Sequence, residues 1–203
     1  MLFRSQANGG NTLRIVYHGS LNPVRLPVTV LQALAQLPAT VTLSIVGYET
    51  VGHKGYTARL RQQTQELGLR SRIEFVGVLS QRAELLGHCR QGDIGLAFIP
   101  RDTRDLNEQD MTGASNKPFD YLACGLALLV ADRPDWQTMF VEPGYGLACD
   151  PENADSLAAA LWWFLEHPVE MREMGERGRQ RITTEWHYER HFAPVLTILN
   201  SRT

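Results

Sequence analysis

The sequence predicts an α/β fold in which a doubly wound parallel sheet carries helices on both faces. Three observations lead to this prediction. Short apolar runs and helix-like segments alternate at least five times along the 203 residues, which is typical of parallel sheets. The run at 126–131 is apolar at every position, as expected of a strand covered on both faces. Glycine or proline closes most segments. Right-handed crossovers favour a doubly wound topology, and from the alternation we expect the strand order 3-2-1-4-5-6.

The first half of the chain gives three strands and two helices. The strands are short apolar runs that end near a glycine: residues 13–17, 41–46 and 73–76. Residues 27–36 carry apolar side chains at helical spacing and end before Pro38. Residues 56–67 are rich in Arg, Gln and Glu, and Gly68 follows as a C-terminal signal. Residues 1–11 are polar and rich in Gly and Asn, so we expect a linker or disordered start before a domain spanning 12–203.

The next segment repeats the same cycle. Ser80 is the expected N-cap of a helix at 81–90, and an apolar strand at 94–99 follows. A polar loop then leads to a short helix at 116–124, and the apolar strand 126–131 comes directly after it.

The last third of the chain predicts a weak sixth strand and several helices. The strand is expected at 147–149, after a short helix at 136–140. A longer helix follows Asp150 and Pro151, and its inward face is Leu157, Leu161, Phe164 and Leu165. Gly175 and Gly178 give the next helix a close-packing face. A final helix at 186–199 contains Pro194.

Composition excludes several functional classes. The chain is 43% hydrophobic and 21% charged, which is ordinary for a globular domain. Its 20 basic and 22 acidic residues give a net charge of −2, so we expect no nucleic-acid partner. No apolar run approaches the roughly 20 residues of a transmembrane helix, so we expect no transmembrane segment.

Cysteine and histidine spacing predicts no metal site. Cys89, Cys124 and Cys149 are too far apart for a disulfide framework or a zinc site, and each lies in or beside an apolar stretch. We therefore expect buried, inert thiols and a reducing, cytoplasmic setting, with the chain either free or peripheral at the inner membrane face. His187 and His191 could share a helical face, but no third ligand stands nearby.

Ligands of doubly wound sheets bind beyond the carboxyl ends of the strands. The loop at 18–26 is one such place, because Gly19 permits close backbone approach and the next helix points its amino end at the loop. Arg25 adds a positive charge. A tight strand-to-helix turn is the alternative interpretation. The loop carries no G-x-G-x-x-G pattern, which weakens a nicotinamide-cofactor reading.

The loop at 100–116 is the second candidate. Ser115 or Asn116 is a suitable helix cap. Lys117 stands at the amino end of the helix, where its charge opposes the helix dipole unless an anion binds there. Asp120 is expected in the first turn, either to complement the dipole or to hold a ligand hydroxyl.

Five segments also resemble a known family, and they occur in its order: Ile15–Pro23, Leu43–Gly47, Glu66–Gly77, Asp93–Pro100 and Ser115–Gly125. From Leu13 to Leu199 the chain is similar to the C-terminal, donor-nucleotide-binding half of a GT-B glycosyltransferase of family 4, or group 1. This resemblance implies a Rossmann-like domain. The acceptor-binding N-terminal domain would be absent, so the chain would be an excised domain or would need a partner chain.

The resemblance implies donor-binding roles for particular residues. Gly19 and Arg25 would contact the donor diphosphate, and backbone amides near Ser115 and Asn116 would cradle phosphate and sugar. Asp120 would take the place of the second acid of the family's acidic pair and bind the ribose hydroxyls.

Two positions depart from the family pattern. The first acid of the pair falls on Thr112, and the basic residue that usually follows the loop glycine is Ser20. Neutralisation of the diphosphate would then depend on Arg25 and Lys117.

The family chemistry implied is retaining, metal-independent transfer from a nucleotide diphosphate sugar, without a further cofactor, in glycan or glycolipid biosynthesis. We expect the isolated domain to be inactive, because transfer takes place in a cleft between two domains. Two alternatives stay open. A non-catalytic interaction module could retain the fold, or the domain could belong to a sugar-nucleotide epimerase.

Overall fold

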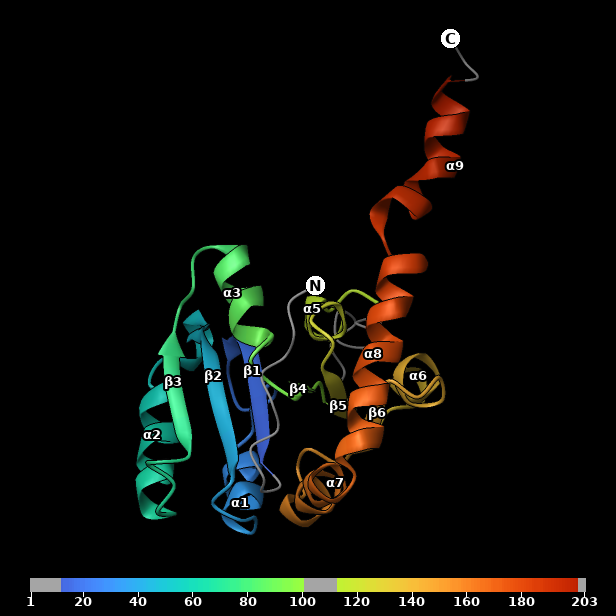
Figure 1. The fold of residues 1–203 in the computed structure, drawn as a ribbon. Helices are drawn as coiled ribbons and strands as arrows, with labels where there is room; N and C mark the ends of the chain where they lie inside the picture. Colours follow the sequence, from blue (N-terminus) through green and yellow to red (C-terminus); the bar gives the residue numbers. More distant parts are fainter. Residues whose placement is uncertain (1–11, 101–112, 201–203) are drawn as a thin grey trace.

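A computed structural model describes residues 12–100 and 113–200 of the chain. Its core is a six-stranded parallel sheet with the strand order β3-β2-β1-β4-β5-β6 (Figure 1). This confirms the predicted fold class and strand order. The strands are β1 Leu13–Leu21, β2 Val41–Glu49, β3 Ile73–Gly77, β4 Ile94–Ala97, β5 Ala127–Ala131 and β6 Gly146–Cys149.

Helices cover the sheet, and several of them also contact one another. The helices are α1 Thr29–Ala35, α2 Tyr56–Glu66, α3 Arg82–Cys89, α5 Asn116–Ala123, α6 Pro134–Trp136, α7 Ala154–Glu166, α8 Pro168–Thr184 and α9 Tyr188–Asn200, with single turns η1 Val51–His53 and η2 Gln137–Val141. α1 packs against α7, and α5 packs against α8. α7 also contacts α8, and α3 contacts α5.

The central strands are buried on both faces. Every residue of β5 has 0% exposure, as its uniformly apolar sequence predicted. α5 approaches β4 closely, because Gly95 has no side chain where the Tyr121 ring lies. α5 is thereby held against the middle of the sheet.

Several element boundaries differ from the prediction; β2, for example, ends at Glu49 instead of residue 46. β1 runs to Leu21, four residues beyond the expected end, because its parallel pairing with β2 continues through Gly19↔Gly47 and Ser20↔Tyr48. Part of the expected loop at 18–26 is therefore strand. Ser80 is not the cap of α3, since Gln81 occupies the N-cap position without a side-chain hydrogen bond.

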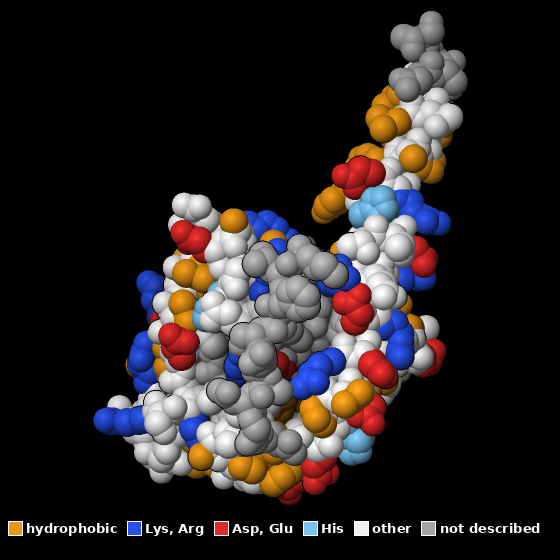
Figure 2. Space-filling model, viewed as in Figure 1, with side chains coloured by type: hydrophobic (Ala, Val, Ile, Leu, Met, Phe, Trp, Pro, Cys, Tyr) orange, Lys and Arg blue, Asp and Glu red, His pale blue; other side chains and the backbone are white. Residues whose placement is uncertain are grey.

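The last two helices have different environments. Gly175 and Gly178 bring α8 close to Gly125 and Leu122, as expected. α9 extends away from the body of the molecule with Pro194 inside it (Figure 1), and its apolar side chains, including Phe192 and Leu196, are exposed (Figure 2).

Burial of the three thiols agrees with the prediction in two cases. Cys89 and Cys149 are buried, but Cys124 is half-buried and its thiol donates to the Leu86 carbonyl at 3.5 Å. Within residues 12–100 and 113–200, no group of three His, Cys, Asp or Glu side chains could hold a metal ion. In the same ranges no helix is both long and apolar enough to cross a membrane.

Candidate functional site

The carboxyl end of β1 and the start of α5 meet at one edge of the sheet. The junction is fixed by Tyr121, whose hydroxyl oxygen accepts a hydrogen bond from the His18 backbone N–H at 2.9 Å. Gly19, Lys117 and Asp120 lie at this junction, and α3 contributes Arg82. The loops after two different strands thus meet where doubly wound folds bind ligands.

Lys117 occupies the space that a side chain at residue 19 would need. Gly19 has a φ of +120°, and a Cβ built on it would lie 2.9 Å from Lys117 Cε. The Lys117 ammonium lies 5.7 Å from the centre of the Tyr17 ring. Burial lowers the pKa of Lys117 to about 8, the Arg25 charge acts in the same direction, and Asp120 opposes both. A bound anion would therefore stabilise the charged form of this lysine.

Asp120 is buried and already paired. It is the fifth residue of α5 and so lies beyond the first turn, which makes our first-turn expectation wrong. Its Oδ1 lies 2.5 Å from Arg82 Nη2, and its Oδ2 accepts from Arg82 Nη1 at 3.4 Å. Burial raises the Asp120 pKa, although Arg82 and Lys117 lower it. Asp120 is therefore not an exposed helix-start acid, and replacing it would affect more than a weak dipole contact.

His18 is a further buried polar group at this site. Its Nε2 lies 3.4 Å from Asp120 Oδ2 and has no hydrogen-bond partner. The ring meets Tyr121 edge-on, with centroids 4.8 Å apart. Burial, together with the charges of Lys117 and Arg82, lowers the pKa of His18 to about 4. The imidazole is therefore neutral at physiological pH.

Sequence reasoning missed both His18 and Arg82. His18 stands directly before Gly19 in a segment already singled out, so its place at the end of a buried strand was a usable signal. Arg82 lies on α3, 38 positions before Asp120. Nothing in its local sequence indicates that contact.

The remaining residues of the β1–α1 connection hold Arg25 close to this edge. The backbone N–H of Arg25 donates to Asn22 Oδ1 at 2.9 Å, and its guanidinium donates to the Phe98 carbonyl at 3.4 Å. Ser20 lies in β1, where its carbonyl accepts from the Tyr17 hydroxyl at 2.5 Å. Arg25 is thus near enough to Lys117 to influence its pKa.

The amino end of α5 is less capped than expected. Ser115 occupies the N-cap position but makes no side-chain capping hydrogen bond, and Asn116 is the first helical residue. Thr112 lies outside the described residues.

Arg25, Arg82 and Lys117 bring three positive charges to one edge of the sheet, and they come from separate segments of the chain. Asp120 is the acid whose charge acts on both Lys117 and Arg82. Such an arrangement can bind a ligand with two or more negative charges.

A hollow of about 330 Å³ lies elsewhere, beside α1 and α2. Its lining residues are Pro23, Pro27, Val28, Thr29, Gln32, Tyr56, Arg59 and Gln63. It shares none of these with the cluster around Asp120. We therefore build the candidate site on the charged cluster.

Comparison with protein families gives one match. Residues 28–197 match the model of a family described as glycosyl transferase-like. No curated protein sequence matches the chain.

Several solved structures share the fold. Anabaena HepE in complex with UDP superposes with a TM-score of 0.76 at 18% identity, covering 94% of this chain and 49% of that one. Sucrose-phosphate synthase from Thermosynechococcus elongatus gives 0.73 at 21% identity, with 95% and 47% covered. The C-terminal domain of a group 1 glycosyl transferase, LpcC from Francisella tularensis, gives 0.70 at 16% identity, with 86% of each chain covered. This chain spans about half the length of the first two.

Proposed function

The chain belongs to the glycosyl transferase-like family and has the fold of a C-terminal GT-B domain, and from this premise we propose that it binds the nucleotide diphosphate sugar donor of a glycosyltransferase. HepE, one of the proteins with a similar fold, has been solved with UDP and with UDP-glucose. UDP is therefore the first ligand to test.

The observation that carries the proposal is the environment of Lys117. Its ammonium is held between the Tyr17 ring and the glycine at 19, and neighbouring charge and burial lower its pKa. Placing a lysine there costs free energy in the empty protein. A diphosphate beside it would return that free energy as a charge-assisted contact.

The donor would lie across the carboxyl edge of the sheet. Its phosphates would contact Lys117, Arg25 and the amides near Ser115 and Asn116, close to Gly19. Its ribose hydroxyls would bind Asp120. Ser20 offers no charge, so Arg25 and Lys117 would neutralise the diphosphate in its place.

The proposed reaction is retaining and metal-independent transfer, in which these cationic side chains stabilise the departing diphosphate. A partner domain or chain would bind the acceptor, a glycan or glycolipid precursor at the cytoplasmic side of the membrane. The chain alone would lack acceptor positioning and exclusion of water, which both contribute strongly to rate. We expect no acceptor-dependent sugar transfer from residues 1–203 alone.

Titration calorimetry with UDP, GDP and ADP tests the binding proposal. Lys117→Met should weaken binding of the preferred diphosphate about ten- to hundredfold, the equivalent of one charge-assisted hydrogen bond. Lys54→Met is the matched control, because Lys54 is the chain's other lysine and is exposed. If the wild-type chain binds none of the three at millimolar concentration, the proposal is wrong, and an interaction module becomes the better interpretation. Hydrolysis of the donor without an acceptor would favour an epimerase-like domain instead.

A further inference from the structure

The Arg82–Asp120 pair joins one exposed and one buried side chain. The Arg82 side chain is 65% exposed and that of Asp120 is 4% exposed. Arg82 is the first residue of α3, whereas Asp120 lies within α5, which is packed against the sheet. Arg82 can therefore change its partner by side-chain rotation alone, and Asp120 cannot follow it.

Arg82 also binds the same Asp120 carboxylate oxygens that ribose hydroxyls would bind. It contacts Asp120 Oδ1 at 2.5 Å and Oδ2 at 3.4 Å, and His18 Nε2 faces Oδ2 from the protein side at 3.4 Å. Because Arg82 is the exposed partner, its guanidinium lies between the buried Asp120 carboxylate and solvent. Two hydroxyl groups could reach this carboxylate only after the guanidinium moves.

We propose that Arg82 blocks the Asp120 carboxylate in the ligand-free protein and releases it when a phosphate of the ligand binds. On binding, its guanidinium exchanges the carboxylate for a phosphate of the ligand, for which the planar fork of arginine is equally suited. Asp120 then becomes free to accept the ribose hydroxyls. This inference rests on the proposed function and adds a specificity role to it, with Arg82 as a residue that contacts the ligand phosphate.

Arg82 would couple the binding of the diphosphate to the binding of the nucleoside. A nucleoside alone would have to displace Arg82 without giving it a new partner, whereas a nucleoside diphosphate supplies one. The site would therefore select against unphosphorylated nucleosides even where the base and ribose fit. Coupling between two ligands that bind adjacent subsites is reciprocal, and its usual range is about 5- to 150-fold.

The test uses uridine and inorganic pyrophosphate as separate ligands that represent the two parts of UDP. In the wild-type chain, saturating pyrophosphate should tighten uridine binding about tenfold or more, measured by titration calorimetry. In Arg82→Gln the two should bind independently, within about twofold, and uridine alone should bind more tightly than it binds the wild type. Arg90→Gln removes the same charge at the other end of α3 and should keep the wild-type coupling.

A second variant guards against loss of folding. Arg82→Lys keeps the positive charge but loses the planar fork, so its coupling should fall between those of the wild type and Arg82→Gln. The coupling between uridine and pyrophosphate in the wild-type chain can be measured even if a variant does not fold.

The outcomes separate the two proposals. If UDP binds but uridine and pyrophosphate bind independently in the wild type, Arg82 is only a structural ion pair and the donor site remains. Coupling that survives in Arg82→Gln also overturns the role of Arg82. If UDP does not bind, both proposals are wrong.

Discussion

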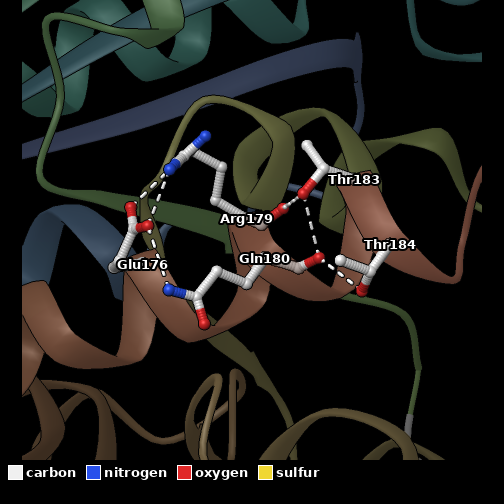
Figure 3. A network of polar contacts seen from close by, with 5 residues as sticks. All are labelled: Glu176, Arg179, Gln180, Thr183 and Thr184. Carbon is white, nitrogen blue, oxygen red and sulfur yellow. Dashed lines mark hydrogen bonds and ion pairs between the residues drawn. The ribbon is translucent and has the colours of Figure 1, made fainter.

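Two arginine–carboxylate pairs in this chain have similar contacts and opposite surroundings. Arg82 Nη2 lies 2.5 Å from Asp120 Oδ1, and it joins α3 to α5. Arg179 Nη2 lies 2.7 Å from Glu176 Oε1 on the surface of α8. Gln180 also donates to Glu176, and Thr183 and Thr184 donate to carbonyls of the preceding turn (Figure 3). Both side chains of the α8 pair are about half exposed.

Burial, rather than the contact, decides how each acid behaves. Arg179 holds the pKa of Glu176 below its usual value, because water still solvates the carboxylate and little opposes the hydrogen bonds. Asp120 has an equally close arginine, yet burial raises its pKa. The charged state of Glu176 is therefore favoured at the surface, while burial opposes the charged state of Asp120.

The largest difference between the two regions should appear on acidification. His18, beside Asp120, has a pKa of about 4, against 6.5 for an unperturbed histidine. The unfolded chain therefore takes up this proton first as the pH falls. Stability that is present above pH 6.5 is lost toward pH 4, by about 3 kcal/mol. Urea denaturation at pH 7 and pH 4.5 measures this loss.

The matched variants are His18→Asn and His187→Asn. His18→Asn should lose less stability on acidification than the wild type. His187→Asn, at a partly exposed position beside Glu189, should behave like the wild type. An equal acid loss in His18→Asn would show that His18 does not carry this effect.

Replacing Asp120 and replacing Glu176 should also have very different effects on UDP affinity. Asp120→Asn should weaken UDP binding about ten- to hundredfold, because a charge-assisted hydrogen bond contributes about 1.5–3 kcal/mol. Glu176→Gln should leave it unchanged, since Glu176 lies on the outer surface of α8. Titration calorimetry decides the point, and unchanged affinity in Asp120→Asn would remove Asp120 from the donor site.

Stability should respond unequally to loss of the two arginines. Arg82→Gln leaves a buried carboxylate with fewer partners, and we expect a loss of about 1–3 kcal/mol in the free energy of unfolding. Lys117 nearby and protonation of Asp120 keep the loss below that of an isolated buried charge. Arg179→Gln should cost less than about 1 kcal/mol, as for other surface pairs. Equal losses by chemical denaturation would contradict the comparison.

The smallest expected effect is that Asp120 and Glu176 contribute to the pH dependence of stability with opposite signs. Because the folded pKa of Asp120 is raised, its contribution to stability is present at low pH and lost as pH rises above 3.8. Asp120→Asn should therefore gain on the wild type as pH rises. Glu176 has a lowered pKa, so its contribution is lost as pH falls below 4.5. Glu176→Gln should therefore fall behind the wild type as pH rises. Unfolding free energies between pH 3 and pH 7 give both slopes, and slopes of equal sign would contradict this assignment.

The sheet could be predicted because its signals are local. Each strand is a short apolar run with its own terminating residue, and alternation with helices favours a doubly wound sheet whose common strand order is the one observed. The end of β1 could not be placed in this way. It depends on pairing between Gly19 and Gly47, which are far apart in the sequence and not apolar.

The candidate site was predictable only in part. Gly19, Lys117 and Asp120 were found because they follow strands whose carboxyl ends share one edge. Asp120 was placed one turn too early, and its burial was missed because it depends on α3 and β1 together. Arg82 was missed because a charged residue at the start of an exposed helix has many ordinary uses. His18 was not considered as a site residue.

The pairing of Gly19 with Gly47 restricts which sequences this edge of the sheet can accept. A side chain at residue 47 would overlap the Gly19 carbonyl, so even alanine there would force β1 and β2 apart. At residue 19, alanine would need both a left-handed backbone and a displaced Lys117. In a saturation-mutagenesis library, these two positions should be among the least tolerant in the chain. Residue 47 should tolerate no substitution even where binding is not selected, because the obstacle there is backbone rather than a movable side chain.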